Sequence, residues 1–241
     1  MVALGNFFFK YRNQLFVFLY LALLLPSPPL FTERVFGAHF YLWPIGLGLL
    51  ITVAGQLIRG VSISLVYIVR GGKDKKVYAE GLVTEGMFNH CRNPLYVGNI
   101  LMLGGVGVLS NSRLYLAVFI PLFLVIYQAI VLAEESFLRG KFGSQFDDYC
   151  SRVNRWLLNP TGLGDTFRHH HFNGWRWLLK EYNTQFVWLV GITLLLLLKY
   201  PQLTHGNDDL RNRLLLIVLL GLTAIYLFIK YLKKSGRLRA D

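Results

Sequence analysis

Charged residues are scarce in this chain. Asp, Glu, Lys and Arg make up 16% of its 241 residues, whereas about a quarter of an average soluble domain is charged. Hydrophobic residues make up 54% of the chain, and the mean hydropathy is +0.44. This composition excludes an ordinary soluble domain and predicts an all-α integral membrane protein, because helices hydrogen-bond their own backbone inside a bilayer.

Cysteine is nearly absent as well. Cys91 and Cys150 are the two cysteines of the chain, and two such residues cannot build a disulfide framework or a metal site. The run His169-His170-His171 lies in a basic stretch without a spaced carboxylate or cysteine partner, and we interpret it as an exposed polar segment. We therefore expect no metal ion, and we interpret both cysteines as bystanders.

Long apolar runs make up much of the sequence, and several approach the ~18–20 residues that cross a bilayer. They lie at about 13–31, 39–58, 95–110, 114–133, 186–200 and 213–230. We therefore predict about six transmembrane helices. The third and fifth runs are short, and three prolines interrupt the first, which leaves open whether each is kinked, tilted or partly re-entrant. No cleavage site of a signal peptide follows the first run.

Basic residues are unevenly divided between the two predicted sides. The termini and two loops, about 59–93 and 134–185, hold 20 of the 25 Lys and Arg residues. By the positive-inside rule, both termini, both loops and the active site are expected in the cytoplasm. The net charge of +12 suits contact with anionic headgroups, so we expect membrane lipids, and no nucleic acid, as partners.

The segment HCRNPLYVG (90–98) precedes the third apolar run. Pro94 follows Asn93, a pair that disfavours helix before the proline and starts one well after it. Arg92 is therefore expected at a helix N-terminus, where unpaired N–H groups and its own charge suit a carboxylate or a phosphate. The alternative is that Arg92 extends to lipid headgroups and that Tyr96 belongs to the aromatic belt.

A second polar segment, AEESFLRGKFGSQFDDYCSRVNRW (133–156), follows the fourth apolar run. Glu135 has Arg139 four residues ahead, which predicts an ordinary surface pair. Glu134 has no such partner, and an unpaired acid at the membrane edge is a functional candidate by default. Four later residues have the spacing of an amphipathic surface helix: Phe142, Phe146, Tyr149 and Val153. For these side chains, packing in the core is favoured over contact with a substrate.

Together, the two segments resemble the integral membrane methyltransferases that include isoprenylcysteine carboxyl methyltransferase and the phospholipid methyltransferases. EGLVTEGMFNHCRNPLYVGNI (80–100) is similar to the family pattern LVTxGxYxxxRHPxYxG, and the glutamate pair, FG, Tyr149 and RV follow. The resemblance covers about residues 70–160. It implies a cytoplasm-facing pocket for S-adenosylmethionine without a Rossmann domain, and a lipophilic methyl acceptor that arrives from the bilayer.

The same resemblance implies the residues of the site. The expected catalytic residues are Glu134 and Arg92, with Arg92 suited to the methionine carboxylate and Glu134 to a cation. For an amine acceptor, Glu134 is also the candidate base. Asn93 departs from the usual histidine of the family and cannot titrate near neutrality. The expected cofactor-binding residues are Gly81, Leu82, Val83, Phe88, Arg92, Asn93, Pro94, Leu95, Tyr96 and Glu134.

Three regions are expected along the chain. Residues 1–60 form N-terminal transmembrane helices, 61–160 the methyltransferase core, and 161–241 a cytoplasmic connector with a C-terminal pair of transmembrane helices. The expected function is methyl transfer from S-adenosylmethionine to a prenylcysteine-type carboxylate or a phospholipid amine. The alternative is a non-catalytic membrane scaffold or a small transporter, although no inverted repeat is visible in the sequence.

Overall fold

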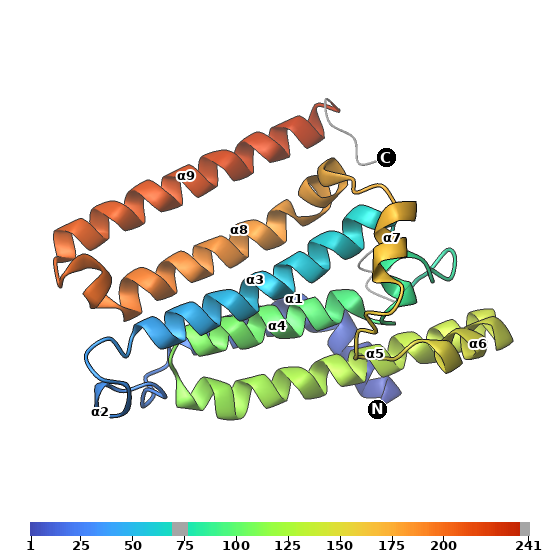
Figure 1. Cartoon of the computed structure of the whole chain (residues 1–241), viewed down its shortest axis with the longest axis horizontal. Helices are drawn as coiled ribbons and strands as arrows, with labels where there is room; N and C mark the ends of the chain where they lie inside the picture. Colours follow the sequence, from blue (N-terminus) through green and yellow to red (C-terminus); the bar gives the residue numbers. More distant parts are fainter. Residues whose placement is uncertain (69–76, 237–241) are drawn as a thin grey trace.

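The computed structural model describes residues 1–68 and 77–236 of the chain. Within these residues the elements are helices and no strand is formed, which confirms the predicted all-α fold. Figure 1 shows the long helices lying side by side in one bundle. The long helices are α1 (Val2–Leu21), α3 (Leu42–Leu65), α4 (Pro94–Leu109), α5 (Ile120–Phe142), α8 (Gly174–Lys199) and α9 (Asp208–Lys234). The shorter ones are α2 (Glu33–Phe36), α6 (Ser144–Arg152) and α7 (Leu163–His169).

The apolar composition of the helices confirms an integral membrane protein. Four helices of the described chain are long and apolar enough to cross a bilayer: Leu42–Leu65, Tyr115–Phe142, Gly174–Lys199 and Asp208–Lys234. The first of these segments is α3, the second is a short π-helix followed by α5, and the others are α8 and α9. Helix α4 is apolar but shorter, and α1 carries Lys10 and Arg12 near its middle. The predicted count of six spans is therefore not confirmed.

Prolines set the end of the first helix. The predicted run 13–31 has the wrong boundaries, because α1 already begins at Val2 and ends at Leu21. One 3₁₀ turn continues to Leu24, and Pro26 follows two residues later. A proline disfavours helical conformation in the residue before it and cannot donate the backbone hydrogen bond that would continue a helix.

Other predicted boundaries agree more closely with the structure. Helix α4 begins at Pro94, as predicted from the Asn-Pro pair. The predicted amphipathic helix is α6, whose Phe146 and Tyr149 are buried against Leu82 and other apolar side chains. Helix α8 begins at Gly174, well before the predicted run, because the Asn173 side chain caps its N-terminus by accepting from the Arg176 amide at 2.8 Å.

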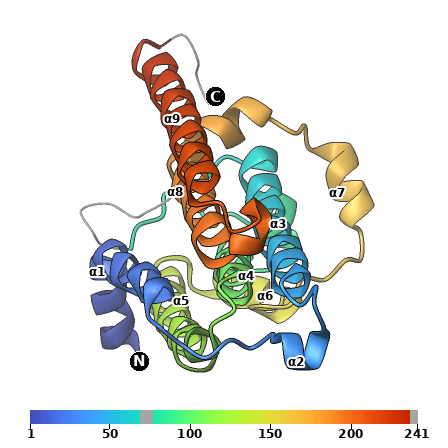
Figure 2. The same ribbon diagram turned by 90° about the vertical axis from the view of Figure 1, so that its left-hand side faces the viewer.

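Small residues allow the central helices to approach closely. Helices α3 and α4 meet at Gly55 and Gly105, where an added β-carbon would overlap the backbone of the opposite helix. Helix α1 packs against α5 at Gly5, where a β-carbon would overlap the carbonyl group of Ala129. Within a bilayer, such close backbone contact is a main source of helix association. Figure 2 shows α1 and α5 together on one side of the bundle and α8 with α9 on another.

One end of the bundle collects most of the polar elements. The start of α1, the ends of α3 and α9, the start of α8 and helices α6 and α7 all lie there, whereas α2 lies at the opposite end (Figure 1). This arrangement places the start of α1, the end of α9 and the described parts of the two predicted loops at the same end. That this end faces the cytoplasm stays a prediction. Several basic residues used in that prediction lie outside the described residues: Arg70, Lys73, Lys75, Lys76, Arg237 and Arg239.

Candidate active site

A cavity lies at the end of the bundle where the polar elements gather. Its volume is about 810 Å³, and small-molecule sites have volumes of ~300–1,000 Å³. The wall is formed by side chains of α1, α3, α4, α5, α6 and α8 and by the loop 77–88. The cavity therefore combines segments that are distant in sequence.

The two motif segments meet at this cavity. Of the ten residues predicted to bind the cofactor, nine line its wall: Gly81, Leu82, Val83, Phe88, Arg92, Asn93, Leu95, Tyr96 and Glu134. The exception is Pro94, which is buried at the first position of α4 and begins that helix. Contact of these residues with a cofactor stays a prediction. That prediction requires the residues to lie around one space, and they do.

Glu134 has a neutral partner. The hydroxyl group of Tyr96, in the first turn of α4, donates a hydrogen bond of 2.7 Å to Glu134 Oε1. No cation of the described chain lies within ion-pair distance of this carboxylate. The sequence singles out Glu134 because it has no basic residue one turn ahead, and its role in the site stays a prediction. Tyr96 lies 38 positions before Glu134 in the chain, so the spacing of residues within one helix could not predict this hydrogen bond.

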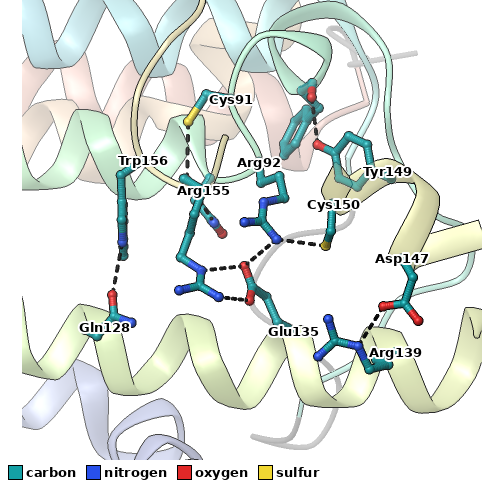
Figure 3. A network of polar contacts seen from close by, with 12 residues as sticks. Cys91, Arg92, Gln128, Glu135, Arg139, Asp147, Tyr149, Cys150, Arg155 and Trp156 are labelled. Carbon is teal, nitrogen blue, oxygen red and sulfur yellow. Dashed lines mark hydrogen bonds and ion pairs between the residues drawn. The ribbon is translucent and has the colours of Figure 1, made fainter. Parts of the chain in front are cut away.

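Glu135 is buried, and its predicted surface pair with Arg139 is wrong. Its carboxylate accepts hydrogen bonds from Arg155 Nε at 2.9 Å and Nη2 at 2.7 Å, as Figure 3 shows. Arg139 instead donates to Asp147 at 2.8 Å on the surface. The reason is the turn at Gly143 (φ +53°), which folds α6 back beside the end of α5. The chain after α6 then brings Arg155 to Glu135.

Arg92 shares the carboxylate of Glu135. Its Nη1 lies 3.3 Å from Glu135 Oε1 and also contacts the sulfur of Cys150 (Figure 3). The Nε–H group of Arg92 is buried and has no hydrogen-bond partner within the described chain. A buried donor without a partner is costly, and the Arg92 side chain lines the cavity wall.

Two buried groups hold the motif loop in place beside Arg92. The hydroxyl group of Tyr149 donates a hydrogen bond of 2.6 Å to the carbonyl oxygen of Phe88, and burial raises the pKa of Tyr149, which keeps the donor proton in place. The thiol of Cys91 is fully buried and lies 3.5 Å from the carbonyl oxygen of Arg155. Burial raises the pKa of Cys91, so this thiol is a neutral packing group rather than a nucleophile.

An ion pair in the wall was not predicted. Arg59 of α3 donates from Nε and Nη2 to the two carboxylate oxygens of Glu181 in α8, at 2.9 and 2.7 Å. Its Nη1 also donates to Asn99 and to the carbonyl oxygen of Leu95 in α4. The signal in the sequence is that Arg59 directly follows the apolar run 39–58, and a charged residue at the membrane edge is a functional candidate.

Further wall residues come from the two ends of the chain. Helix α8 contributes Lys180, Asn183 and Thr184. Helix α1 contributes Phe9, Arg12, Asn13, Phe16 and Tyr20. Sequence reasoning missed both sets, although the spacing of the α1 residues places them on one face of a helix.

The histidine run has ordinary contacts. His169 is the last residue of α7, and its Nδ1 lies 2.7 Å from the carbonyl oxygen of Asp165. Nδ1 of His170 lies 3.0 Å from the carbonyl oxygen of Thr166. Within residues 1–68 and 77–236, no three His, Cys, Asp or Glu side chains are grouped so that they could hold a metal ion.

Known proteins similar to this chain fall into two groups. The chain is 37% identical over 115 residues to the nickel-cobalt-cadmium resistance protein NccN of Alcaligenes xylosoxydans xylosoxydans, covering 47% of this chain and 51% of that protein. It is 38% identical over 72 residues to the cobalt-zinc-cadmium resistance protein CzcN of Cupriavidus metallidurans, covering 30% of this chain and 33% of that protein. The chain thus spans about half or less of these two proteins.

The other group carries enzyme names. The chain is 26% identical over 140 residues to protein-S-isoprenylcysteine O-methyltransferase A of Arabidopsis thaliana, covering 55% of this chain and 70% of that protein. The sequence profile of the phospholipid methyltransferase family matches residues 43–145, from α3 into α6. No solved structure matches the chain. The profile covers less than half of the chain, and together with these relatives it shows that this part of the chain is similar to the integral membrane methyltransferases of phospholipids and of isoprenylcysteine.

Proposed function

We propose that this protein transfers a methyl group from S-adenosylmethionine to a lipophilic acceptor, either a prenylcysteine-type carboxylate or a phospholipid amine. The observation that carries the proposal is the cavity of about 810 Å³ on which both motif segments converge. The family match, which covers the loop 77–88, α4 and Glu134, supports the same reaction class.

The residues present fit the proposed cofactor. S-adenosylmethionine carries a carboxylate, an ammonium group and a sulfonium group. The guanidinium of Arg92 suits the carboxylate, Glu134 suits either cation, and the rings of Phe88 and Tyr96 suit the adenine or the sulfonium. When bound, the cofactor supplies a methyl group attached to a positively charged sulfur.

The chain contributes position and charge. Displacement at a methyl group depends mainly on alignment of the reacting atoms and on exclusion of water. Tyr96 holds one oxygen of Glu134 at 2.7 Å and so orients the carboxylate within the cavity. For an amine acceptor, the other oxygen of Glu134 takes the proton that the amine must lose before it attacks, whereas a carboxylate acceptor attacks without a base.

The proposed site draws on all three predicted regions of the chain. Residues 1–60 supply the α1 face and Arg59, 61–160 supply the motif segments, and 161–241 supply the α8 wall. A fragment limited to the predicted core would lack two of the walls. We therefore propose that helix α8 acts in the site as well as in anchoring.

Cofactor binding tests the proposal most directly. Calorimetry on the purified chain in lipid nanodiscs should detect S-adenosylmethionine, and Arg92→Ala should weaken binding about ten- to a hundred-fold, because a charge-assisted hydrogen bond contributes ~1.5–3 kcal/mol. Arg139→Ala is the matched control, since Arg139 is exposed and not on the cavity wall. Mass spectrometry of lipid extracts incubated with labelled cofactor should then identify the acceptor.

Absence of cofactor binding by the wild-type protein would contradict the proposal and favour the scaffold or transporter. Unchanged affinity in a folded Arg92→Ala protein would instead contradict the role of Arg92 alone. The two outcomes are separated by the wild-type titration.

The cytoplasmic placement of the site is also a proposal. In a cysteine-free background, Cys at position 208 should react with an impermeant reagent on intact cells, whereas Cys at position 168 should not. Both native side chains, Asp208 and Arg168, are highly exposed, so access within each side is equal. The opposite labelling pattern would show that the proposed orientation is reversed.

A further inference from the structure

Helix α1 presents one mixed face to the cavity. Phe9, Arg12, Asn13, Phe16 and Tyr20 all line the wall, and their spacing of three, four and seven residues is that of a single helix face. The face has three aromatic rings and one full positive charge. It lies outside residues 43–145, the part of the chain that matches the methyltransferase family.

Arg12 has no carboxylate partner within the described residues. No Asp or Glu oxygen lies within ion-pair distance of its guanidinium, which packs over the ring of Phe9 at 4.8 Å. It is near enough to Glu134 and Tyr96 to interact with them electrostatically. Arg12 therefore faces the same space as the proposed catalytic carboxylate.

The other two guanidinium groups on the cavity wall each lie beside a carboxylate. Arg59 is paired with Glu181 at 2.7 Å, and Arg92 lies 3.3 Å from Glu135. Arg12 differs from both because its charge is not balanced by an adjacent carboxylate of the described chain. A cation on the wall of a partly apolar cavity favours an anionic group of a ligand in that cavity.

We infer that Arg12 binds the anionic group of the methyl acceptor, a carboxylate or a phosphate, while the aromatic rings of α1 contact its apolar chain. The inference rests on the proposed function. An amphipathic acceptor matches the face because Phe9, Phe16 and Tyr20 offer apolar contact on either side of the guanidinium. The cofactor is assigned to the motif residues across the cavity, so it does not require Arg12.

Lys10 provides a matched control for Arg12. It lies on the same helix and carries the same charge, but it is exposed, packs over Tyr11 and is not on the cavity wall. Arg12→Gln and Lys10→Gln therefore remove equal charge from α1, and only the first removes it from the cavity.

The test measures binding of two anionic probes to protein in nanodiscs saturated with S-adenosylhomocysteine, which occupies the cofactor site without methyl transfer. The probes are N-acetyl-S-farnesylcysteine, with a carboxylate, and oleoyl lysophosphatidylethanolamine, with a phosphate. Arg12→Gln should weaken the binding of at least one probe about ten- to a hundred-fold. Arg12→Lys, which keeps the charge, should weaken binding of that probe less. Lys10→Gln should bind both probes as the wild type does. The probe that is affected identifies the anionic group.

Three results would overturn the inference: no binding of either probe to the wild type, equal probe binding by Arg12→Gln and the wild type, or weakened binding of S-adenosylhomocysteine alone. Each leaves the proposed function in place if the wild-type protein binds the cofactor. Failure of the wild type to bind cofactor would instead overturn the proposed function and this inference together.

Discussion

Arg59 and Glu181 form a buried ion pair that joins α3 to α8 across 122 positions of sequence. Glu181 is fully buried, and both of its carboxylate oxygens accept from the guanidinium. The same guanidinium donates to the carbonyl oxygen of Leu95, one residue from Tyr96. The pair therefore connects the C-terminal helices to the motif helix of the proposed site.

Removing one member of this pair should destabilise the protein strongly. Arg59→Met leaves the Glu181 carboxylate buried without its main cation, which costs about 3–5 kcal/mol, whereas the double variant Arg59→Met/Glu181→Leu should recover much of the loss. Thermal unfolding of the purified protein in one detergent would compare the two. Equal midpoints for the single and double variants would show that the pair is not coupled.

Glu135→Gln should also lower the stability of the fold. If Glu135 were paired with Arg139 on the surface, the same substitution would have almost no effect. The change removes the charge that Arg155 and Arg92 share, at a cost of about 1.5–3 kcal/mol, because Glu135 is only 6% exposed. Arg139→Gln is the control on the same helix, and its thermal midpoint should equal that of the wild type, since that pair is exposed. Identical midpoints for the two variants would contradict the buried network.

Glu134→Gln should lower methyl transfer strongly while the protein stays folded. The substitution keeps the size and the acceptor for Tyr96 but removes the charge that stabilises a bound cation. Tyr96→Phe should lower turnover less, because the carboxylate remains and loses only its orienting hydrogen bond. Transfer of labelled methyl groups, normalised to folded protein, measures both effects, and full activity of Glu134→Gln would remove Glu134 from the proposed mechanism.

The same substitution should affect only one of two neighbouring glycines of α4. Gly105→Ala places a methyl group against the backbone of Thr52 in α3, so the helices must separate or the protein must fail to fold. Gly104→Ala adds the same group where no atom lies within 4 Å. Folded yield after extraction should fall for Gly105→Ala only, and equal yields would show that the helix contact is not tight.

Local patterns in the sequence determined much of this protein. Hydropathy identified the membrane class, the Asn93-Pro94 pair predicted where α4 begins, and aromatic spacing predicted α6. Nine of the ten predicted cofactor residues also converge on one cavity. Hydropathy, the start of α4 and the spacing of α6 depend on residues within a few turns of each other, so a linear sequence contains them. The cofactor residues came instead from the resemblance to a known family.

Tertiary structure alone decided the partners of the charged groups. The i,i+4 rule paired Glu135 with Arg139, but the turn at Gly143 moved Arg139 to Asp147 and brought Arg155 to Glu135 instead. The contribution of α1 and α8 to the cavity likewise depends on which helices pack side by side. Spacing within one helix shows which side chains share a face, whereas the neighbour of that face depends on packing between helices that are distant in sequence.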